Sequence, residues 1–396
     1  MSKYLLTYED AQEIAKKYHN NNFWESQHML NGFKVSTFNY FICGWNDFAN
    51  PLPNKPHVNA FDMRGVTFTF DKKGKQVGRF FMLPKFFNIN QVEATLYHNV
   101  KDKKIEAISV KEDGSLVGFM NLPDGKLFAK TIGSFVSDQS QAAYGILYTY
   151  EEHVIWVKEL LKMGYTPLFE YVSWDNRIVL KYGDAHLRFI GVRDNMIGDF
   201  ISAGECESIS ELADIPDGIY RIPEEIGTLD ELLERAKIEQ DKEGWVIKYP
   251  GMLMKVKTAW YFKLHGLRTE NVFREDYVIS NYLGETLDDL MTQLNPKEDN
   301  DAFEFVKTVT GAINNYIAYI DKCTSKLKLI YEKEYDDKWH YFAKFYNKEP
   351  YFGLARTLID RPEEYNFRKV EMILKKTYRL KTAKQIVDKW KTKEPK

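Results

Sequence analysis

The sequence predicts an α+β protein with antiparallel sheet in its first two thirds and an all-helical region after it. Short runs that alternate apolar and polar residues, separated by polar turns, recur as far as Tyr261, which is typical of antiparallel strands. From about Leu267 onward, apolar residues recur at helical spacing while Gly and Pro become rare. We therefore expect two domains, residues 1–266 and residues 267–396, each large enough for its own core.

The first domain should begin with a helix and continue through short strands. In chain order we expect a helix over 7–19 capped by Thr7, an aromatic-rich extended stretch over 33–48, a Pro-rich loop over 51–56, strands over 66–70 and 77–83, a strand on each side of Lys111, and a strand over 126–131 after the turn at Pro123-Asp124-Gly125.

The second half of this domain should alternate helices and strands. We expect a helical pattern over 138–163 that ends at Gly164, strands over 168–172, 178–182 and 187–192, a helix over 229–240 opened by the capping box Thr228–Glu231, and a strand pair over 244–249 and 253–261 with Pro250-Gly251 as its turn.

In the helical region, one apolar face and one late capping box stand out. Thr382-Ala383-Lys384-Gln385 should open a last helix, and Lys and Arg dominate residues 366–396, whereas Asp and Glu dominate residues 285–304. The apolar face is formed by Phe303, Val306, Ile313, Ile317 and Ile320.

Composition excludes several classes of protein. No stretch approaches the roughly 18 apolar residues of a membrane span, and no signal peptide is expected at the N-terminus. Cys43, Cys206 and Cys323 lie far apart, which excludes a Cys-x-x-Cys zinc site and a disulfide framework and favours a reducing cytoplasm. A net charge of -2 does not indicate a nucleic-acid binder, although the high aromatic content is compatible with stacking on unpaired bases.

A lysine one residue before an Asp-Gly pair, Lys111-Glu112-Asp113-Gly114, lies between two alternating runs. Asp-Gly in that setting is typical of a hairpin turn, so an exposed hairpin lysine is one interpretation. The pattern Lys-x-Asp-Gly by itself arises by chance in about one chain in ten. Its meaning therefore depends on the residues that follow.

Two carboxylates and a lysine pair follow Lys111 on expected strands: Glu170, Glu243, and Lys255 with Lys257. Residues two apart in a strand point to the same face, so Lys255 and Lys257 would direct both ammonium groups to one place. A nucleophilic lysine with two carboxylates and two further cations is suited to attack on a nucleotide phosphate.

This set of residues, in this order, resembles the covalent nucleotidyltransferases, which include ATP-dependent ligases and capping enzymes. Closer still, the chain resembles the phage RNA ligase 1 family of the T-even type, from about residue 35 to about residue 265. The residues that carry the resemblance are Met63-Arg64-Gly65-Val66, Pro84-Lys85-Phe86-Phe87-Asn88, Lys111-Glu112-Asp113-Gly114-Ser115, Asn176-Arg177-Ile178-Val179, Val192-Arg193, and Lys255-Val256-Lys257 with Trp260-Tyr261.

The resemblance implies an antiparallel-sheet nucleotidyltransferase domain of the ligase type (ATP-grasp-like), followed by a helical domain that selects the RNA. It also implies that Lys111 attacks the α-phosphate of ATP to give lysyl–AMP. An amine attacks only when neutral, and Lys255, Lys257, Arg64 and a metal ion would favour that form by like-charge repulsion.

The family assigns a role to each remaining site residue. By resemblance, Lys255 and Lys257 neutralise phosphate charge in the transition state, Glu170 holds the ribose hydroxyls, and Glu243 serves the metal or the reacting phosphate. Arg64 and Lys85 grip the β- and γ-phosphates, and Phe38 lies at the nucleotide. Val246 matches one wall of the adenine site, and Phe189 is either the other wall or a core strand residue. Asp288 with Asp289 matches a pair that binds a divalent ion, Mg²⁺ or Mn²⁺, the alternative being a solvated helix face.

Two departures from the family pattern affect the nucleotide. Where the family has Tyr-Asn-Tyr, this chain has Phe38-Asn39-Tyr40, so a hydroxyl contact is lost. Where the family has Lys-x-Lys-Gly-Ser, this chain has Lys130-Thr131-Ile132-Gly133-Ser134. Lys130 keeps the first lysine and Ile132 replaces the second, which puts one nucleotide contact in doubt and could weaken ATP binding.

From this resemblance we expect an ATP-dependent RNA ligase that joins RNA 5′-phosphate and 3′-hydroxyl ends through lysyl–AMP and RNA-adenylate intermediates. The resemblance further implies a monomer that repairs nicked tRNA in the cytoplasm of a phage-infected bacterium, with no membrane partner. The alternatives are a DNA ligase or capping enzyme, in which an OB barrel of short strands usually follows the Lys-x-Lys strand, and a nucleic-acid-binding protein that has lost catalysis.

Overall fold

The computed structural model describes residues 4–18, 22–40, 43–173, 183–261, 273–283, 287, 291, 300–334, 339–349, 351–362 and 365. The chain divides into two compact units, residues 1–267 and residues 268–396. Unit 1 contains three mainly antiparallel sheets with helices packed on them, and the described part of unit 2 contains helices only. The α+β class expected from the sequence is therefore confirmed.

The first sheet of unit 1 has the order β1-β2-β3-β4 and is antiparallel throughout. Helix α1 (Tyr8–Lys17) packs on β1, and its Thr7 N-cap side chain accepts a hydrogen bond from the Asp10 amide, as expected from the sequence. The expected extended stretch over 33–48 instead contains strand β2 followed by helix α2 (Trp45–Ala49). The strands are β1 (Phe23–Leu30), β2 (Phe33–Tyr40), β3 (Thr67–Phe70) and β4 (Gln76–Phe80).

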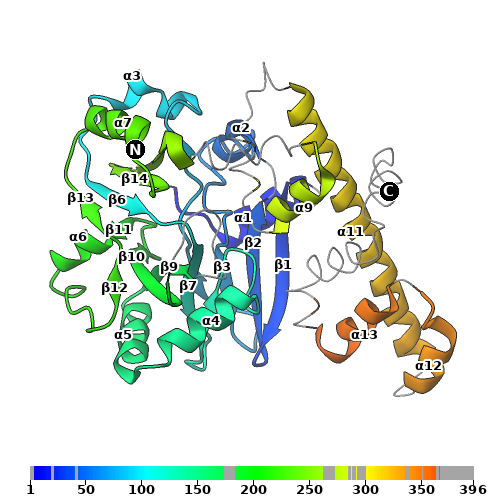
Figure 1. Ribbon diagram of the computed structural model, residues 1–396. Helices are drawn as coiled ribbons and strands as arrows, with labels where there is room; N and C mark the ends of the chain where they lie inside the picture. Colours follow the sequence, from blue (N-terminus) through cyan, green and yellow to red (C-terminus); the bar gives the residue numbers. More distant parts are fainter. Residues whose placement is uncertain are drawn as a thin grey trace. The chain divides into compact units, whose positions relative to one another are not determined.

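The second sheet has the order β11-β10-β9-β7-β8, with β12 paired in parallel to β10. The expected helix over 138–163 is two helices (Figure 1), and the second packs on β9 with Val157 and Leu160 buried. The elements are β7 (Ser115–Asn121), β8 (Leu127–Lys130), α4 (Asp138–Leu147), α5 (Glu151–Lys162), β9 (Tyr165–Val172), β10 (His186–Asp194), β11 (Phe200–Ser202), α6 (Ala203–Glu207) and β12 (Tyr220–Arg221).

The third sheet has the order β13-β6-β14-β15-β5. Its residues contribute to a hydrophobic core that contains the fully buried Trp245. The capping box at Thr228 forms as expected, and the helix that it opens packs against β15. Strand β15 ends at Lys257, short of the expected Tyr261. The elements are β5 (Phe87–Asn88), η1 (Glu93–Thr95), α3 (Tyr97–Val100), β6 (Ala107–Lys111), β13 (Glu224–Glu225), α7 (Leu229–Ile238), β14 (Gly244–Tyr249) and β15 (Met252–Lys257).

The connection between β6 and β7 overturns the hairpin interpretation of Asp113-Gly114. Strand β6 pairs with β13 and β14 in the third sheet, whereas β7 pairs with β8 and β9 in the second. Residues 112–114 therefore carry the chain from one sheet to the next, and Asp113 is 1% exposed rather than at a hairpin tip. Lys111 consequently lies at the junction of two sheets.

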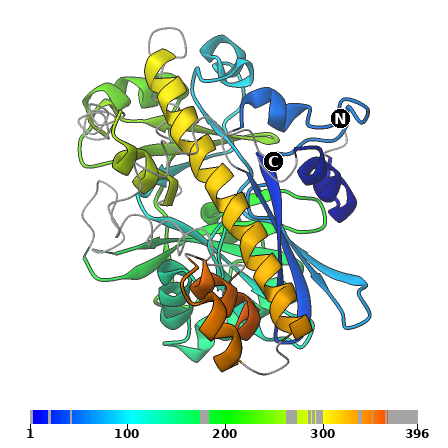
Figure 2. The same ribbon diagram turned by 90° about the vertical axis from the view of Figure 1, so that its right-hand side faces the viewer.

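Unit 2 is organised around the long helix α11 (Asn300–Glu334), seen along its length in Figure 2. Val306, Ile313, Ile317 and Ile320 are buried on one face of this helix, as their spacing predicts. Helices α9 and α13 pack against α11. The other helices of this unit are α9 (Glu275–Leu283), α12 (Trp339–Tyr346) and α13 (Phe352–Asp360).

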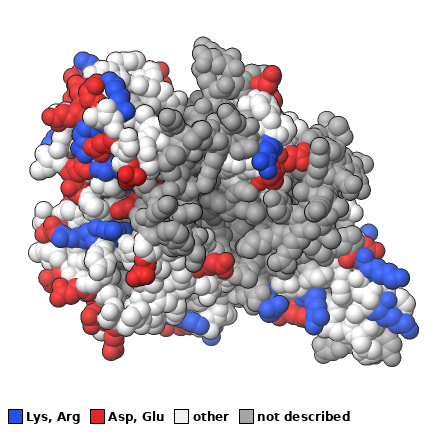
Figure 3. Space-filling view, in the orientation of Figure 1, with Lys and Arg blue, Asp and Glu red and all other residues white. Residues whose placement is uncertain are grey.

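Several predictions lie outside the described residues: the strand over 178–182, the Asn176–Val179 motif, Asp288 and Asp289, the capping box at Thr382 and the basic segment 366–396. Within the part of the chain that the structure describes, no helix combines the length and the apolar content needed to span a membrane. On the face shown in Figure 3, acidic and basic side chains of the described residues are interspersed, in keeping with the net charge of -2.

Candidate active site

Three charged side chains meet where β6, β14 and β15 lie side by side. Gly244, the first residue of β14, is paired with Lys111 on one side and with Lys257 on the other. Directly opposite residues of antiparallel strands share a face, so both lysines project on the same side of the sheet. Glu243 Oε1 lies 2.8 Å from Lys111 Nζ and 2.9 Å from Lys257 Nζ. One carboxylate oxygen therefore holds both ammonium groups.

Gly244 makes this close arrangement of strands possible. Its φ is +151°, and a Cβ built on it would lie 2.0 Å from the Val256 carbonyl oxygen. No residue with a side chain fits there without displacing β15. Gly244 is thus required by the packing of β14 on β15, and Glu243 by its charge.

Glu170, on β9 of the second sheet, approaches the cluster formed by Lys111, Glu243 and Lys257. The Gly114 amide donates a hydrogen bond to Glu170 Oε1 at 3.2 Å, and Lys111, Glu243 and Arg64 all act on its charge. Loss of solvent raises the pKa of Glu170 to about 8, outweighing the opposing effect of Lys111 and Arg64. Without nucleotide, the carboxyl is therefore mostly protonated at neutral pH and can both donate and accept a hydrogen bond.

The raised pKa of Glu170 makes the protein less stable as pH rises. Between the ordinary pKa of 4.5 and the folded-state pKa of about 8, the unfolded chain releases a proton that the folded chain keeps, so stability falls across this window. Glu170→Gln removes the effect and should gain stability relative to the native chain, by roughly a few kcal/mol across the window. Urea denaturation of both proteins without nucleotide measures this; a stability difference that does not change with pH would contradict it.

Gly114 is required because the segment 111–114, which carries Lys111, passes very close to β9. A Cβ on Gly114 would lie 2.4 Å from the Tyr171 carbonyl oxygen and 3.0 Å from Cγ of Glu170. We expect Gly114→Ala to lower the free energy of unfolding by about 1–3 kcal/mol, because rigid backbone must move. Gly145→Ala in α4 is the matched control, since its Cβ would meet nothing within 4 Å; it should be neutral or stabilising by up to about 1 kcal/mol in thermal or urea unfolding.

Lys255 and Lys85 are buried beside aromatic rings. Lys255 Nζ lies 5.5 Å from the centre of the Phe86 ring. Lys85 Nζ lies 5.2 Å from the Tyr40 ring and 5.3 Å from the Phe87 ring. A cation within about 6 Å of a ring centre is attracted by the negative face of the ring. Their predicted roles toward phosphate stay predictions.

Hydrogen bonds that were not predicted from the sequence hold Arg64 and the segment around it. Its Nη1 donates to the Leu83 carbonyl oxygen at 3.3 Å. The segment that carries it is fixed by two buried cations: Arg193, which bonds Asp62 at 2.8 Å and the Met82 carbonyl oxygen at 2.7 Å, and Lys130, whose Nζ donates to the Gly65 carbonyl oxygen. Lys130, the lysine that this chain shares with the family's Lys-x-Lys-Gly-Ser pattern, thus contacts backbone beside Arg64.

Phe38 and Phe189 do not join this group of side chains. Phe38 is fully buried and packs edge-to-face against Tyr8 and Phe68 in the core of the first sheet. Phe189 is fully buried against Trp156 of α5 and Phe169. Neither ring reaches solvent, and the predicted contacts of these two residues with nucleotide stay predictions. The half-buried Val246 on β14 remains available for that role.

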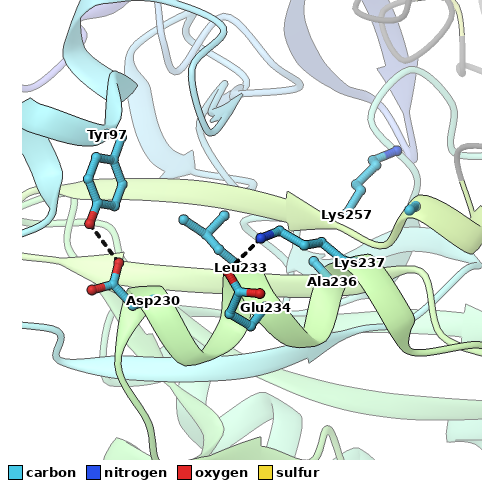
Figure 4. Close-up of a pocket in the computed structure, with 8 residues that line it drawn as sticks. Tyr97, Asp230, Leu233, Glu234, Ala236, Lys237 and Lys257 are labelled. Carbon is cyan, nitrogen blue, oxygen red and sulfur yellow. Dashed lines mark hydrogen bonds and ion pairs between the residues drawn. The ribbon is translucent and has the colours of Figure 1, made fainter.

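A cavity of about 500 Å³ lies on the α7 side of β15 (Figure 4). Figure 4 shows the Lys257 side chain extending away from the α7 residues, so its ammonium group belongs to the opposite side of the sheet. This cavity is therefore separate from the Lys111–Glu243 site. It is lined by Tyr97, Asp230, Leu233, Glu234, Ala236, Lys237, Lys257 and Ala259.

Comparisons with known proteins place the chain in a family and find several similar structures. The model of the RNA ligase family matches residues 62–268. A protein of Thermovibrio ammonificans with the provisional name RNA ligase is 26% identical over 271 residues, which are 66% of this chain and 68% of that protein. The solved structure of an archaeal ATP-dependent RNA ligase is similar over 76% of each chain, at 13% identity and a TM-score of 0.45. A protein from Aquifex aeolicus, provisionally named an ATP-dependent DNA ligase, is similar over 83% of this chain and 81% of its own, at 16% identity and a TM-score of 0.45.

Proposed function

The chain belongs to the RNA ligase family, and on this premise we propose that it is an ATP-dependent RNA ligase with Lys111 as its nucleophile. The observation that carries the proposal is the Glu243 carboxylate shared by Lys111 and Lys257 at 2.8 and 2.9 Å. It places a lysine amine and a second cation each within hydrogen-bond distance of one proton acceptor, Glu243 Oε1. These are the groups that amine attack on a phosphate requires.

In the first step, Lys111 Nζ attacks the α-phosphorus of ATP. A P–N bond forms to AMP and the P–O bond to pyrophosphate breaks. Lys111 must lose a proton to attack, and Glu243 Oε1, at 2.8 Å from Nζ, is in position to accept it. Lys257 remains beside Glu243, where its charge stabilises the phosphoryl oxygens of the transition state. Arg64 and Lys85 hold the β- and γ-phosphates, and Glu170 holds the ribose.

In the second step the 5′-phosphate of an RNA displaces Lys111 from AMP, and in the third a 3′-hydroxyl attacks the adenylated end and releases AMP. Negative charge develops on phosphoryl oxygens each time, so Lys255 and Lys257 can serve all three steps. Mg²⁺ or Mn²⁺, when bound, neutralises part of that charge. Glu243 would hold it together with nucleotide oxygens. Among the described residues, no group of three or more His, Cys, Asp or Glu side chains is arranged to hold a metal ion. Asp288 and Asp289 would hold a further ion.

The substrate that we propose is nicked tRNA, with unit 2 selecting the RNA. Support comes from the helices of this unit: the described residues of 273–365 form helices and no strand, whereas a DNA ligase or capping enzyme usually continues with an OB barrel. The tRNA-repair role in a phage-infected cell follows from the family resemblance alone.

Two assays test the proposal. The protein is mixed with Mg²⁺ and labelled ATP or GTP, and the adduct on Lys111 is located by intact-mass and peptide analysis. We expect one AMP per chain and labelling by ATP over GTP. Joining is then measured on a nicked tRNA, a linear RNA and a DNA oligonucleotide with the same ends. Preferential labelling by GTP would indicate a capping enzyme, and joining of DNA but not RNA would indicate a DNA ligase.

A further inference from the structure

A row of side chains crosses the second sheet from the Lys111 site to an exposed strand. Arg188 on β10 is paired with Glu170 on β9 at one side and with Tyr220 on β12 at the other (the strands are labelled in Figure 1). Directly paired residues of neighbouring strands project from the same face of a sheet. Glu170, Arg188 and Tyr220 therefore share the face on which Glu170 approaches Lys111.

Exposure to solvent increases along this row. The Glu170 carboxyl is desolvated, the Arg188 side chain is 28% exposed, and Tyr220 is 60% exposed. The row thus leads outward from the buried site over the surface of the sheet. A polymer whose end reacts at Lys111 needs such an open path, because the rest of the polymer stays in solvent.

The Arg188 guanidinium is held through its Nε. This nitrogen donates to His186 Nε2 at 3.1 Å and lies 3.8 Å from Oε1 of Glu112, the residue directly after Lys111. Among the described residues, neither Nη group of Arg188 makes a hydrogen bond. The Nη donors are therefore available to an anion, and their planar arrangement matches the oxygens of a phosphate.

Tyr220 presents an aromatic ring at the outer end of the row. Its ring meets the His186 ring edge-to-face, with the ring centres 5.9 Å apart. His186 therefore contacts both Arg188 and Tyr220 and keeps the two side chains beside each other. An exposed ring next to a phosphate-binding cation is suited to stacking on an unpaired base.

We propose that this row receives the 5′ end of the RNA strand: Arg188 binds the terminal phosphate, and the Tyr220 ring stacks on the first base. This role rests on the proposed function, because it places the RNA that takes AMP from Lys111. A phosphate on Arg188 lies close to Lys111, since Glu112 joins the two. The cations predicted to bind the phosphates of ATP lie outside the second sheet, so loss of Arg188 should affect RNA and not ATP.

Arg188→Met tests this separation in two reactions. The protein is adenylylated with ATP, freed of ATP, and mixed with 5′-phosphorylated RNA under single-turnover conditions. Formation of the adduct should stay within about twofold of the native rate. The RNA concentration for half-maximal transfer of AMP should rise about 10- to 100-fold, because a charge-assisted contact is lost. Slower adenylylation with unchanged transfer would place Arg188 at ATP and contradict the proposal.

Arg221→Met is the matched control. Arg221 follows Tyr220 on β12, projects from the opposite face of the sheet and pairs with Glu207. Its loss removes the same charge from a nearby exposed position, and both reactions should stay within about twofold of the native rates. If Arg221→Met weakens transfer as much as Arg188→Met, general attraction of RNA explains the effect and the role of Arg188 is wrong.

Binding without ATP tests recognition of the phosphate itself. Fluorescence anisotropy compares one RNA with a 5′-phosphate and the same RNA with a 5′-hydroxyl. The native protein should bind the phosphorylated RNA more tightly, and Arg188→Met should bind the two RNAs equally. A preference that survives in Arg188→Met would contradict the assignment.

Tyr220→Ala keeps the test decisive should Arg188→Met not fold, because Tyr220 is exposed. Its half-maximal RNA concentration should rise about tenfold, and Tyr220→Phe, which keeps the ring, should behave as native. With RNA that lacks its first base, native protein and Tyr220→Ala should be equal; a persisting difference would contradict the stacking. If native protein forms no adduct, the proposed function fails. If it does, and neither Arg188→Met nor Tyr220→Ala alters transfer, only the role of this row is wrong.

Discussion

Lys111→Met is expected to abolish the AMP adduct, with a loss of more than about a thousandfold in adenylylation. Methionine keeps an unbranched side chain of similar length but has no nucleophile. The ion pair of Glu243 with Lys257 is untouched, so the carboxylate is still balanced. Far-UV circular dichroism and the melting temperature should therefore stay close to native values, which separates lost chemistry from lost folding.

The same variant should still complete the last step of the reaction. When RNA that already carries a 5′-adenylate is supplied, no lysine nucleophile is needed, and Lys111→Met should seal it at a measurable rate. Lys237→Met provides the control, because it removes an exposed lysine that pairs with Glu234 on α7 and should leave both reactions unchanged. An AMP adduct on Lys111→Met, at any lysine, would contradict the assignment of the nucleophile.

Elements that depend on local chemistry could be predicted from the sequence. The Thr7 cap of α1 and the Thr228 capping box of α7 satisfy amides a few residues away, and β14 and β15 are joined by a short turn at Pro250-Gly251. Strand β1 was missed because its sequence, Phe23 to Leu30, interleaves polar residues without clean alternation. Its burial is decided by the sheet it joins rather than by its own pattern.

Features that depend on distant segments could not be predicted. Asp113-Gly114 looks like a hairpin turn, yet the glycine is needed because Tyr171, 57 positions later, packs against it. The burial of Lys130 and Arg193 follows from carbonyl groups supplied by remote segments, which sequence spacing does not reveal. Phe38 was placed at the nucleotide by resemblance, whereas its own packing with Tyr8 and Phe68 is a tertiary property.

Glu243→Ala is expected to cause the largest loss of stability in unit 1. Glu243 and Lys257 are each 2% exposed at the side chain, and Lys111 is 20% exposed. Without the carboxylate, two ammonium groups face each other with little solvent, and removal of one partner from a buried pair typically costs about 3–5 kcal/mol. Adenylylation should fall with it, because the acceptor for the Lys111 proton is lost. Glu243→Gln keeps an oxygen acceptor and should lose less stability but a similar share of activity.

A double-mutant cycle distinguishes this effect from simple loss of packing. If the cost of Glu243→Ala comes from an uncompensated charge, adding Lys257→Met should restore part of the stability, because it removes the cation left without its partner. If the cost came only from lost packing, the double variant would lose at least the sum of the stability losses of the two single variants. The exposed pair Glu234–Lys237 gives the reference: Glu234→Ala should cost less than about 1 kcal/mol, since solvent screens such pairs. Urea denaturation of the native protein, the two single variants and the double variant at one pH measures the coupling energy between Glu243 and Lys257. A coupling energy no larger than that of the exposed pair would mean that Glu243 does not hold the two lysines together.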